Sequence, residues 1–256
     1  MKDETPNGPV EESVPGEQPS VAIVTGAARR VGREIALAMA NRGLGVVVHH
    51  GTSKVEADSL VNRIKNDGGQ AIAVAADLRE PRKAAIAVME AADKLGPASV
   101  LINSAAVFQD RALPWLDVYH CNLHVNVNML APVFLIQQFM KHLGEGETGH
   151  IINILDWRAL RPEQSHLIYT ATKAAMVSIT KSLALQLAPR VYVNAIAPGA
   201  ILPPEDRTNW HQQRAIGSIP LRKTGSPGDL CAAINFLLDS QFITGEILHV
   251  SGGEEL

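Results

Sequence analysis

The stretch Val21-Ala22-Ile23-Val24-Thr25-Gly26-Ala27-Ala28-Arg29-Arg30-Val31-Gly32 decides the fold of this 256-residue chain. Its first half is a short apolar run that ends in glycine, which predicts a buried parallel strand. The apolar residues Val31, Ile35 and Met39 then recur at helical spacing. Gly43 marks the end of this predicted helix. A strand that turns directly into a helix presents backbone N–H groups and the positive end of the helix dipole to a phosphate. The stretch therefore predicts the phosphate-binding turn of a nucleotide-binding domain.

The rest of the chain repeats this alternation of strands and helices. The predicted strands span residues 21–25, 45–49, 71–75, 100–103, 151–155, 191–197 and 247–250, and the predicted helices span residues 31–42, 54–67, 82–95, 123–142, 169–187 and 229–238. Such alternation favours right-handed crossovers and a parallel sheet that helices cover on both faces. We predict one doubly wound, Rossmann-type α/β domain over residues 21–256, with a sheet of about seven strands and ligands outside the carboxyl ends of the strands.

Composition narrows the class of protein. A chain with 46% hydrophobic residues can bury one large core, and a net charge of -3 gives no electrostatic case for nucleic acid or an anionic membrane. Cys121 and Cys231 cannot form a disulfide framework. Residues 1–20 are acidic and rich in proline and glycine, which predicts a disordered tail rather than a signal peptide. With no unbroken apolar run long enough to span a membrane, we expect a cytoplasmic protein.

The glycine turn and the end of the second strand point to the cofactor. Gly26 permits a tight turn, and Gly32 lets the helix pack closely on the strand. Arg29 and Arg30 place two cations beside the positive end of a helix dipole, which favours a bound anion over two merely solvated charges. The segment His49-His50-Gly51-Thr52-Ser53-Lys54 lacks the carboxylate that would bond the ribose hydroxyls of NAD and repel a 2′-phosphate. We therefore expect NADP(H), although the same polar segment can also cap the next helix.

Further motifs agree in order and spacing with a known family. They are the Thr25-Gly26 turn, Asp77-Leu78, Asn103-Ser104-Ala105-Ala106, Asn128 followed by Ala131-Pro132, Tyr169-x-x-x-Lys173, and Pro198-Gly199. With these motifs the chain resembles the short-chain dehydrogenase/reductase family over residues 21–253. The resemblance implies the fold predicted above and a homotetramer.

Two charged residues depart from the usual pattern of that family. Arg30 stands where the nucleotide turn usually carries a third glycine, and Asp156 stands where the active site usually carries a serine. Both departures resemble the pteridine reductase branch, which includes dihydropteridine and dihydromonapterin reductases. Phe108 follows Asn103 by five residues, where that branch carries an aromatic ring that helps to hold the pterin against the nicotinamide.

The residues and the resemblance together assign three sets of side chains. NADP(H) contacts are expected from Gly26, Arg29, Arg30, Val31, His50, Thr52, Ser53, Asp77, Leu78, Asn103, Ser104, Ala105, Tyr169, Lys173, Pro198 and Gly199. Substrate contacts are expected from Arg30, Phe108, Asp156, Trp157 and Tyr169, and catalysis from Asp156, Tyr169, Lys173 and Asn128. The resemblance implies that Lys173 bonds the nicotinamide ribose and that Asn128 helps a water to connect Lys173 to solvent. No histidine spacing is typical of a metal site, so no metal is expected.

Tyr169 and Lys173 lie on adjacent turns of one predicted helix and share a face. In isolation such a pair is usually an ordinary surface pair. Here, near the nucleotide turn and Asp156, we expect the ammonium group to lower the pKa of Tyr169 toward neutral pH and make it a proton donor during hydride transfer.

Asp156 indicates the substrate class. A serine donates a hydrogen bond to a carbonyl oxygen, whereas a carboxylate only accepts and repels a developing alkoxide. Asp156 therefore favours a substrate with N–H groups or a protonated imine, and a protonated Asp156 would itself deliver a proton. Phe108 would stack on a flat ring, and Arg30 would bridge the cofactor pyrophosphate and the pterin. The plainer alternatives are a core aromatic for Phe108 and a turn cap for Asp156.

These observations predict an NADPH-dependent reductase of a pterin or a related C=N substrate. A carbonyl reductase acting on a ketone, a sugar or a 3-oxoacyl thioester is the first alternative, because specificity changes readily on one fold. A non-catalytic NADP(H)-binding regulator is the second. Residues 201–219 correspond by resemblance to the mobile flap over the substrate.

Overall fold

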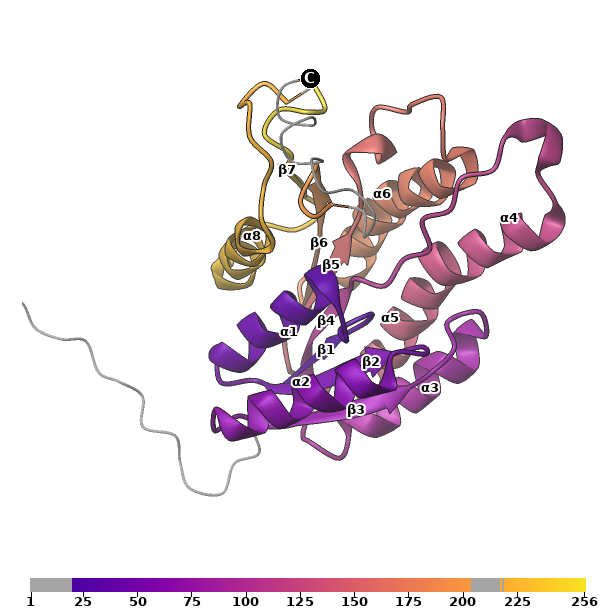
Figure 1. Ribbon diagram of the computed structural model, residues 1–256. Coiled ribbons are helices and arrows are strands. Elements are labelled where there is room, and N and C mark those ends of the chain that lie inside the picture. Colours follow the sequence, from indigo (N-terminus) through magenta and orange to yellow (C-terminus); the bar gives the residue numbers. More distant parts are fainter. Residues whose placement is uncertain (1–19, 204–216, 218) are drawn as a thin grey trace, which may run out of the picture.

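Seven parallel strands form one sheet in the computed structural model, which describes residues 20–203, 217 and 219–256. The strands lie in the order β3-β2-β1-β4-β5-β6-β7 (Figure 1), and each neighbouring pair is parallel. Their bounds are β1 Val21–Val24, β2 Gly45–His50, β3 Ala71–Ala75, β4 Ala98–Asn103, β5 Gly149–Ile154, β6 Val191–Pro198 and β7 Ile247–Val250. The predicted doubly wound sheet is confirmed.

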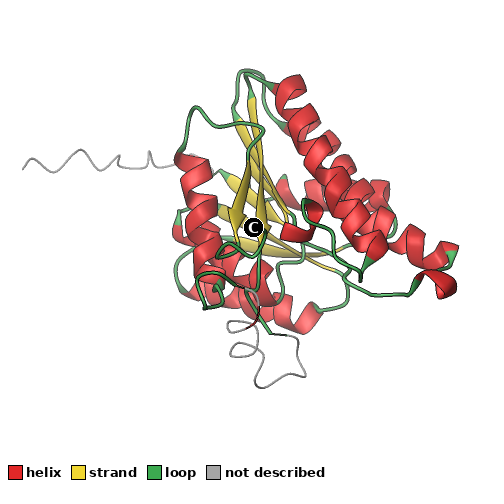
Figure 2. Cartoon of the chain, turned by 90° about the horizontal axis from the view of Figure 1, so that it is seen from above, coloured by secondary structure: helices red, strands yellow, loops and turns green. Residues whose placement is uncertain are grey.

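Helices cover both faces of the sheet (Figure 2). They are α1 Arg30–Asn41, α2 Lys54–Asn66, α3 Pro81–Ala92, α4 Val118–Val125, α5 Ala131–His142, α6 Leu167–Leu187 and α8 Pro227–Asp239. Met39 from α1 and Ile234 from α8 pack on one face, and Val88 from α3 and Phe139 from α5 pack on the other. Burial of each such side chain contributes about 1.5–3 kcal/mol, so the apolar stripes fix each helix against its face.

The helix expected from residue 123 begins five residues earlier, at Val118. Asp117 caps it by accepting a hydrogen bond from the His120 N–H at 2.7 Å. Apolar periodicity does not reveal this first part, because the residues that it buries are His120 and His124. The aspartate at the N-cap position is the sequence signal that would have located the start. A π-helical turn, Asn126–Leu130, then joins α4 to α5.

The strand order brings the site together. The chain fills the sheet outward from β1 to β3 on one side and from β4 to β7 on the other, so the order reverses between β1 and β4. Ligands of doubly wound sheets bind outside the carboxyl ends of the strands at this reversal. A ligand site is therefore expected among the loops after β1, β4, β5 and β6.

No helix within the described residues is long and apolar enough to cross a membrane. Two expectations concern other parts of the chain. Of the predicted disordered tail, residues 1–20, residues 1–19 lie outside the described part, and so do residues 204–216 and 218 of the predicted flap.

Candidate active site

A cavity of about 830 Å³ opens at the carboxyl ends of the strands. Its walls come from the loops after β1, β4, β5 and β6 and from the start of α6. The sequence-predicted residues that line it are Arg30, Val31, Ser104, Phe108, Asp156, Trp157, Tyr169, Lys173, Pro198 and Gly199. The fold therefore gathers the proposed substrate and catalytic residues, apart from Asn128, around one hollow.

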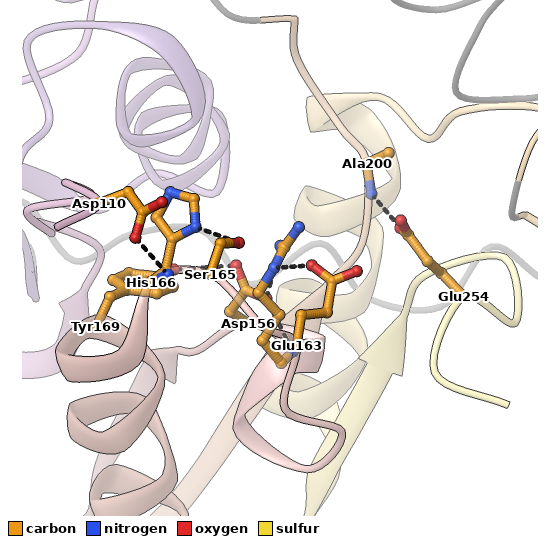
Figure 3. Close-up of polar contacts among 9 residues, drawn as sticks. Asp110, Asp156, Glu163, Ser165, His166, Tyr169, Ala200 and Glu254 are labelled. Atoms are coloured by element: carbon orange, nitrogen blue, oxygen red, sulfur yellow. Dashed lines mark hydrogen bonds and ion pairs between the residues drawn. The ribbon is translucent and has the colours of Figure 1, made fainter. Parts of the chain in front are cut away.

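The carboxylate of Asp156 faces the hydroxyl of Tyr169 in this cavity (Figure 3). The Tyr169 O–H donates to Asp156 Oδ2 at 3.0 Å. The other carboxylate oxygen, Oδ1, accepts from the backbone N–H of Arg158 at 2.9 Å and thereby caps the short 3-10 helix Trp157–Ala159. Asp156 thus caps a turn through Oδ1 and lines the cavity with Oδ2 bonded to Tyr169.

Arg158 extends this contact into a charged network that the sequence analysis missed. Its Nη1 lies 3.3 Å from Asp156 Oδ1, and its Nε donates to Glu163 Oε2 at 2.8 Å. The guanidinium carbon lies 4.7 Å from the centre of the Trp157 ring, a cation–π distance. The available signal was an arginine two residues after an aspartate at a strand end. Asp156 and Glu163 neutralise the charge of Arg158. The ion pair with Arg158 in turn holds Asp156 in one orientation.

The protonation of Tyr169 differs from the sequence-based expectation. Burial and the neighbouring Asp156 carboxylate raise the pKa of Tyr169 well above its ordinary value. The expected lowering of that pKa by Lys173 is wrong. The ammonium group donates instead to the backbone carbonyl of Ile154 at 2.7 Å and lies 5.8 Å from the centre of the Tyr169 ring. Tyr169 is therefore a protonated phenol, which is the form that a proton donor needs.

Lys173 lines the cavity but is almost completely buried. It is 4% exposed, and this burial lowers its pKa to about 8. Nearby Asp156 acts in the opposite direction, because a negative charge favours the ammonium form. Lys173 thus remains mainly protonated at neutral pH but loses its charge within the range in which enzymes are ordinarily assayed.

Phe108 forms an aromatic wall of the cavity. Its ring stacks on the His166 ring with centroids 4.0 Å apart and an interplanar angle of 8°, and it meets Tyr169 edge-on at 4.6 Å. The side chain is 52% exposed, so the alternative of a core aromatic is wrong. The backbone N–H of His166 donates to Asp110 Oδ1 at 2.7 Å (Figure 3). This bond ties the Phe108 loop to the start of α6.

Asn128 holds the same loop from the opposite side. It lies in the π-helical turn and is 2% exposed. Its Oδ1 accepts from the Val107 N–H at 2.8 Å, and its Nδ2 donates to the Val107 carbonyl at 2.9 Å. Nδ2 also lies 3.4 Å from Thr172 Oγ1. The Asn128 side chain therefore positions the segment that carries Phe108.

The turn after β1 has the shape that a dinucleotide phosphate requires. Gly26 has φ 65°, and a Cβ there would lie 2.9 Å from Ala105 Cα. A Cβ on Gly32 would lie 2.2 Å from the carbonyl oxygen of Gly26, so α1 can approach the turn closely only with glycine at that position. Among the described residues no side chain caps the start of α1, and its first residues, Arg30 and Val31, line the cavity. The turn therefore leaves N–H groups of the helix start for an anion.

The two arginines of the turn make different contacts. Arg29 lies 3.9 Å from Glu56, with both side chains about half exposed. Arg30 has φ 53°, a left-handed conformation that is uncommon for a residue with a Cβ. Its guanidinium donates to the Pro203 carbonyl at 2.9 Å. Arg30 thus lines the cavity, and Arg29 remains half exposed to solvent.

The predicted cofactor residues fall into two groups. Seven of the sixteen line the cavity: Arg30, Val31, Ser104, Tyr169, Lys173, Pro198 and Gly199. The nine others lie outside its lining: Gly26, Arg29, His50, Thr52, Ser53, Asp77, Leu78, Asn103 and Ala105. Asp77 pairs with Arg79 at 2.6 Å, and a hydrogen bond from Arg79 lowers its pKa. Leu78 is buried in the core below α3, and Asn103 donates to Asn153 Oδ1 at 2.9 Å inside the sheet.

Comparisons with known proteins agree with this geometry. A family model for short chain dehydrogenases matches residues 20–214. An uncharacterized oxidoreductase from Methylorubrum extorquens is 35% identical over 243 residues, which is 91% of this chain and 96% of that protein. A 3-oxoacyl-acyl-carrier-protein reductase from Synechocystis is 33% identical over 238 residues, which is 91% of this chain and 96% of that protein.

A solved structure gives a close match in three dimensions. FolM alternative dihydrofolate reductase 1 from Brucella suis, crystallised in complex with NADP, aligns with a TM-score of 0.87 at 33% identity. The alignment covers 92% of this chain and 95% of that one. The chain belongs to the short-chain dehydrogenase family.

Proposed function

We propose that this protein is an NADPH-dependent reductase of a pterin or of a related flat heterocycle with a reducible C=N bond. The observation that carries the proposal is the Asp156 carboxylate, which shares a hydrogen bond with the proton donor Tyr169. A carboxylate at this point accepts hydrogen bonds from ring N–H and amino groups, whereas it would repel the oxyanion of a reacting ketone. The substrate class follows from that preference.

The residues around the cavity suit NADP(H), which supplies the hydride when bound. The start of α1 would hold the pyrophosphate. Thr52 and Ser53, at the end of a strand without a carboxylate, would hold the 2′-phosphate. Tyr169 and Lys173 would hold the nicotinamide ribose. The Brucella suis relative, whose fold matches over 92% of this chain, was crystallised with NADP, and this supports the same cofactor here.

Tyr169 and Asp156 would divide the work on the substrate. The protonated Tyr169 hydroxyl, now donating to Asp156, would transfer its proton to the ring nitrogen that accepts it after hydride addition. Asp156 would accept a hydrogen bond from the aminopyrimidinone edge. Phe108, half exposed and held edge-on to Tyr169, would lie against the flat ring.

Reduction of a carbonyl group is the second candidate, and one observation favours it. A curated relative at 33% identity is a 3-oxoacyl-acyl-carrier-protein reductase. The charge of Asp156 stands against this candidate, because negative charge would develop on the ketone oxygen beside a carboxylate during hydride addition. The proposal therefore ranks the C=N substrate first.

The test is NADPH oxidation with two substrate panels. One panel contains dihydrobiopterin, dihydromonapterin and dihydrofolate, and the other contains ketones, aldehydes and a 3-oxoacyl thioester. We expect turnover with the first panel and loss of that turnover, by about 100-fold, in Asp156→Ser. Turnover with carbonyls alone would reject the pterin assignment, and oxidation with neither panel would favour the non-catalytic regulator. An Asp156→Ser variant that retained the pterin rate would reject the role given to the carboxylate.

Two finer expectations belong to the same proposal. We expect a homotetramer, which light scattering after size-exclusion chromatography would detect, and a smaller assembly would contradict it. We also expect a cytoplasmic protein, with Cys121 and Cys231 as free thiols. Recovery of the native protein in an extracytoplasmic fraction would contradict that location.

A further inference from the structure

A buried histidine, His49, connects three segments around the dinucleotide turn. It lies near the end of β2 and is 2% exposed. Its Nδ1 accepts from the N–H of Gly26 at 3.1 Å, and its Nε2 lies 3.0 Å from the carbonyl oxygen of Ala76. Its own carbonyl accepts from the Ala27 N–H at 2.9 Å. One residue thus links the turn after β1 to the ends of β2 and β3.

These contacts select one form of the imidazole. The Gly26 N–H is a donor, so Nδ1 must be the unprotonated nitrogen, and the ring proton must lie on Nε2 and point to Ala76. Burial, with a smaller contribution from the neighbouring His50, lowers the pKa of His49 to about 4. The neutral ring therefore persists at neutral pH, and its acceptor stays directed at the turn.

Gly26 is the residue on which the position of the turn depends. An added Cβ would meet Ala105 at 2.9 Å, and the Gly26 carbonyl oxygen lies only 2.2 Å from where a Cβ of Gly32 would be. Gly26 thus packs against the loop after β4 and against α1 at once. A shift of its N–H displaces the start of α1, whose residues Arg30 and Val31 line the cavity.

We propose that His49 is a positioning residue for the cofactor: through the acceptor Nδ1 it holds Gly26, and so the start of α1, in the arrangement that binds the NADP(H) pyrophosphate. The residue itself is covered by protein, so it acts on the dinucleotide through the turn. Its contribution is therefore to affinity through the turn, and this contribution is separable from its contribution to folding.

Two variants separate the two nitrogens. His49→Asn places an amide oxygen near the position of Nδ1 and can accept from Gly26, but it does not reach Ala76. His49→Gln places its amide near the position of Nε2 and leaves Gly26 without an acceptor. Because an unsatisfied buried N–H is costly, we expect the Kd for NADPH to rise about tenfold or more in His49→Gln and less than about threefold in His49→Asn.

The Kd is measured by titrating NADPH fluorescence in the full-length protein, and thermal unfolding is measured alongside. His150→Gln is the matched control, because His150 stacks on Tyr192 at the opposite end of the sheet. We expect its Kd to equal that of the unmodified protein. Equal Kd values in the Asn and Gln variants, or weakening that follows the loss of thermal stability in all three, would overturn the proposal.

A measurement on the unmodified protein covers the case in which a variant does not fold. Nitrogen-15 NMR distinguishes the two imidazole tautomers, and we expect the His49 proton on Nε2, with a slowly exchanging Gly26 amide. A proton on Nδ1 would overturn the proposal by itself. The titration uses NADPH alone, so its outcome is independent of whether the substrate is a pterin.

Discussion

The two halves of the site are held in contrasting ways. On the cofactor side, neutral groups bond one another: the Thr25 hydroxyl accepts from the Ser104 and Ala105 N–H groups at 2.9 and 3.0 Å, and His49 accepts from Gly26. On the substrate side, charged groups pair, as Asp156 does with Arg158. Hydrogen bonds between uncharged groups fix the conformation of the turn. The charged network, by contrast, can exchange one partner for another when a substrate enters.

Tyr169→Phe tests the substrate side most directly. The phenyl ring keeps the packing against Phe108 but removes the O–H that donates to Asp156. We expect turnover to fall by about 10³-fold or more, because the proton donor is lost, while the Kd for NADPH stays within about twofold. Steady-state rates and NADPH fluorescence measure the two quantities. Undiminished turnover would remove Tyr169 from the mechanism, and an equal loss of NADPH affinity would show that the two halves are not separable.

Acid tests the cofactor side. His49 has a pKa of about 4 in the folded protein against an ordinary value of 6.5, so the unfolded chain takes up a proton first. The stability that the neutral ring supplies is complete above about pH 6.5 and is lost as the pH falls toward about 4. The expected loss is about 3 kcal/mol in the free energy of unfolding. Denaturant titrations at several pH values measure it, and His49→Asn, which cannot titrate, should lack this component. Equal acid sensitivity in both proteins would assign it to other groups.

Arg158→Gln tests whether the charged network orients Asp156. Removing the guanidinium leaves Asp156 Oδ1 with only its backbone donor. We expect kcat for the pterin to fall about tenfold, which corresponds to about 1.4 kcal/mol, with partial recovery in Arg158→Lys. The surface pair Arg42–Asp239, at 2.6 Å, supplies the control Arg42→Gln, which should keep the original rate. An unchanged kcat in Arg158→Gln would show that the backbone cap alone positions the carboxylate.

The smallest expected effect is the alkaline limb of the pH profile. Lys173 has a pKa of about 8 through burial, so its charge near Tyr169 disappears above that pH. We expect kcat/KM for NADPH, which reports groups of the free enzyme, to decline above about pH 8. The folded state binds fewer protons than the unfolded state at this site between about pH 8 and 10.5, so this group makes the protein more stable as the pH rises. A decline accompanied by unfolding would therefore contradict the assignment to Lys173.

How far the sequence predicts the molecule differs between the same two halves. The turn from Gly26 to Gly32 is a local motif, and glycine at its two ends indicates positions where a Cβ would clash. Asp156 and Tyr169 were likewise recognisable by chemical type and position. His49 was not assigned its role, because its partners Gly26 and Ala76 are distant in sequence and offer backbone groups. Arg158 was missed although its partners Asp156 and Glu163 are close in sequence. The lowered pKa expected for Tyr169 was wrong, because burial is a property of the packed molecule.

The π-helical turn Asn126–Leu130 has a consequence for the long helical segment that contains it. The buried residues His120 and Phe139 are nineteen positions apart. In a regular helix, at about 100° per residue, they would point about 100° away from each other. The turn absorbs one residue, which restores both to nearly the same side. It acts as a phase correction in the helix. A continuous α-helix with the same spacing of nineteen positions would turn its two ends about 100° apart, whereas deleting one residue together with the π turn would leave them eighteen positions apart and still facing the protein together.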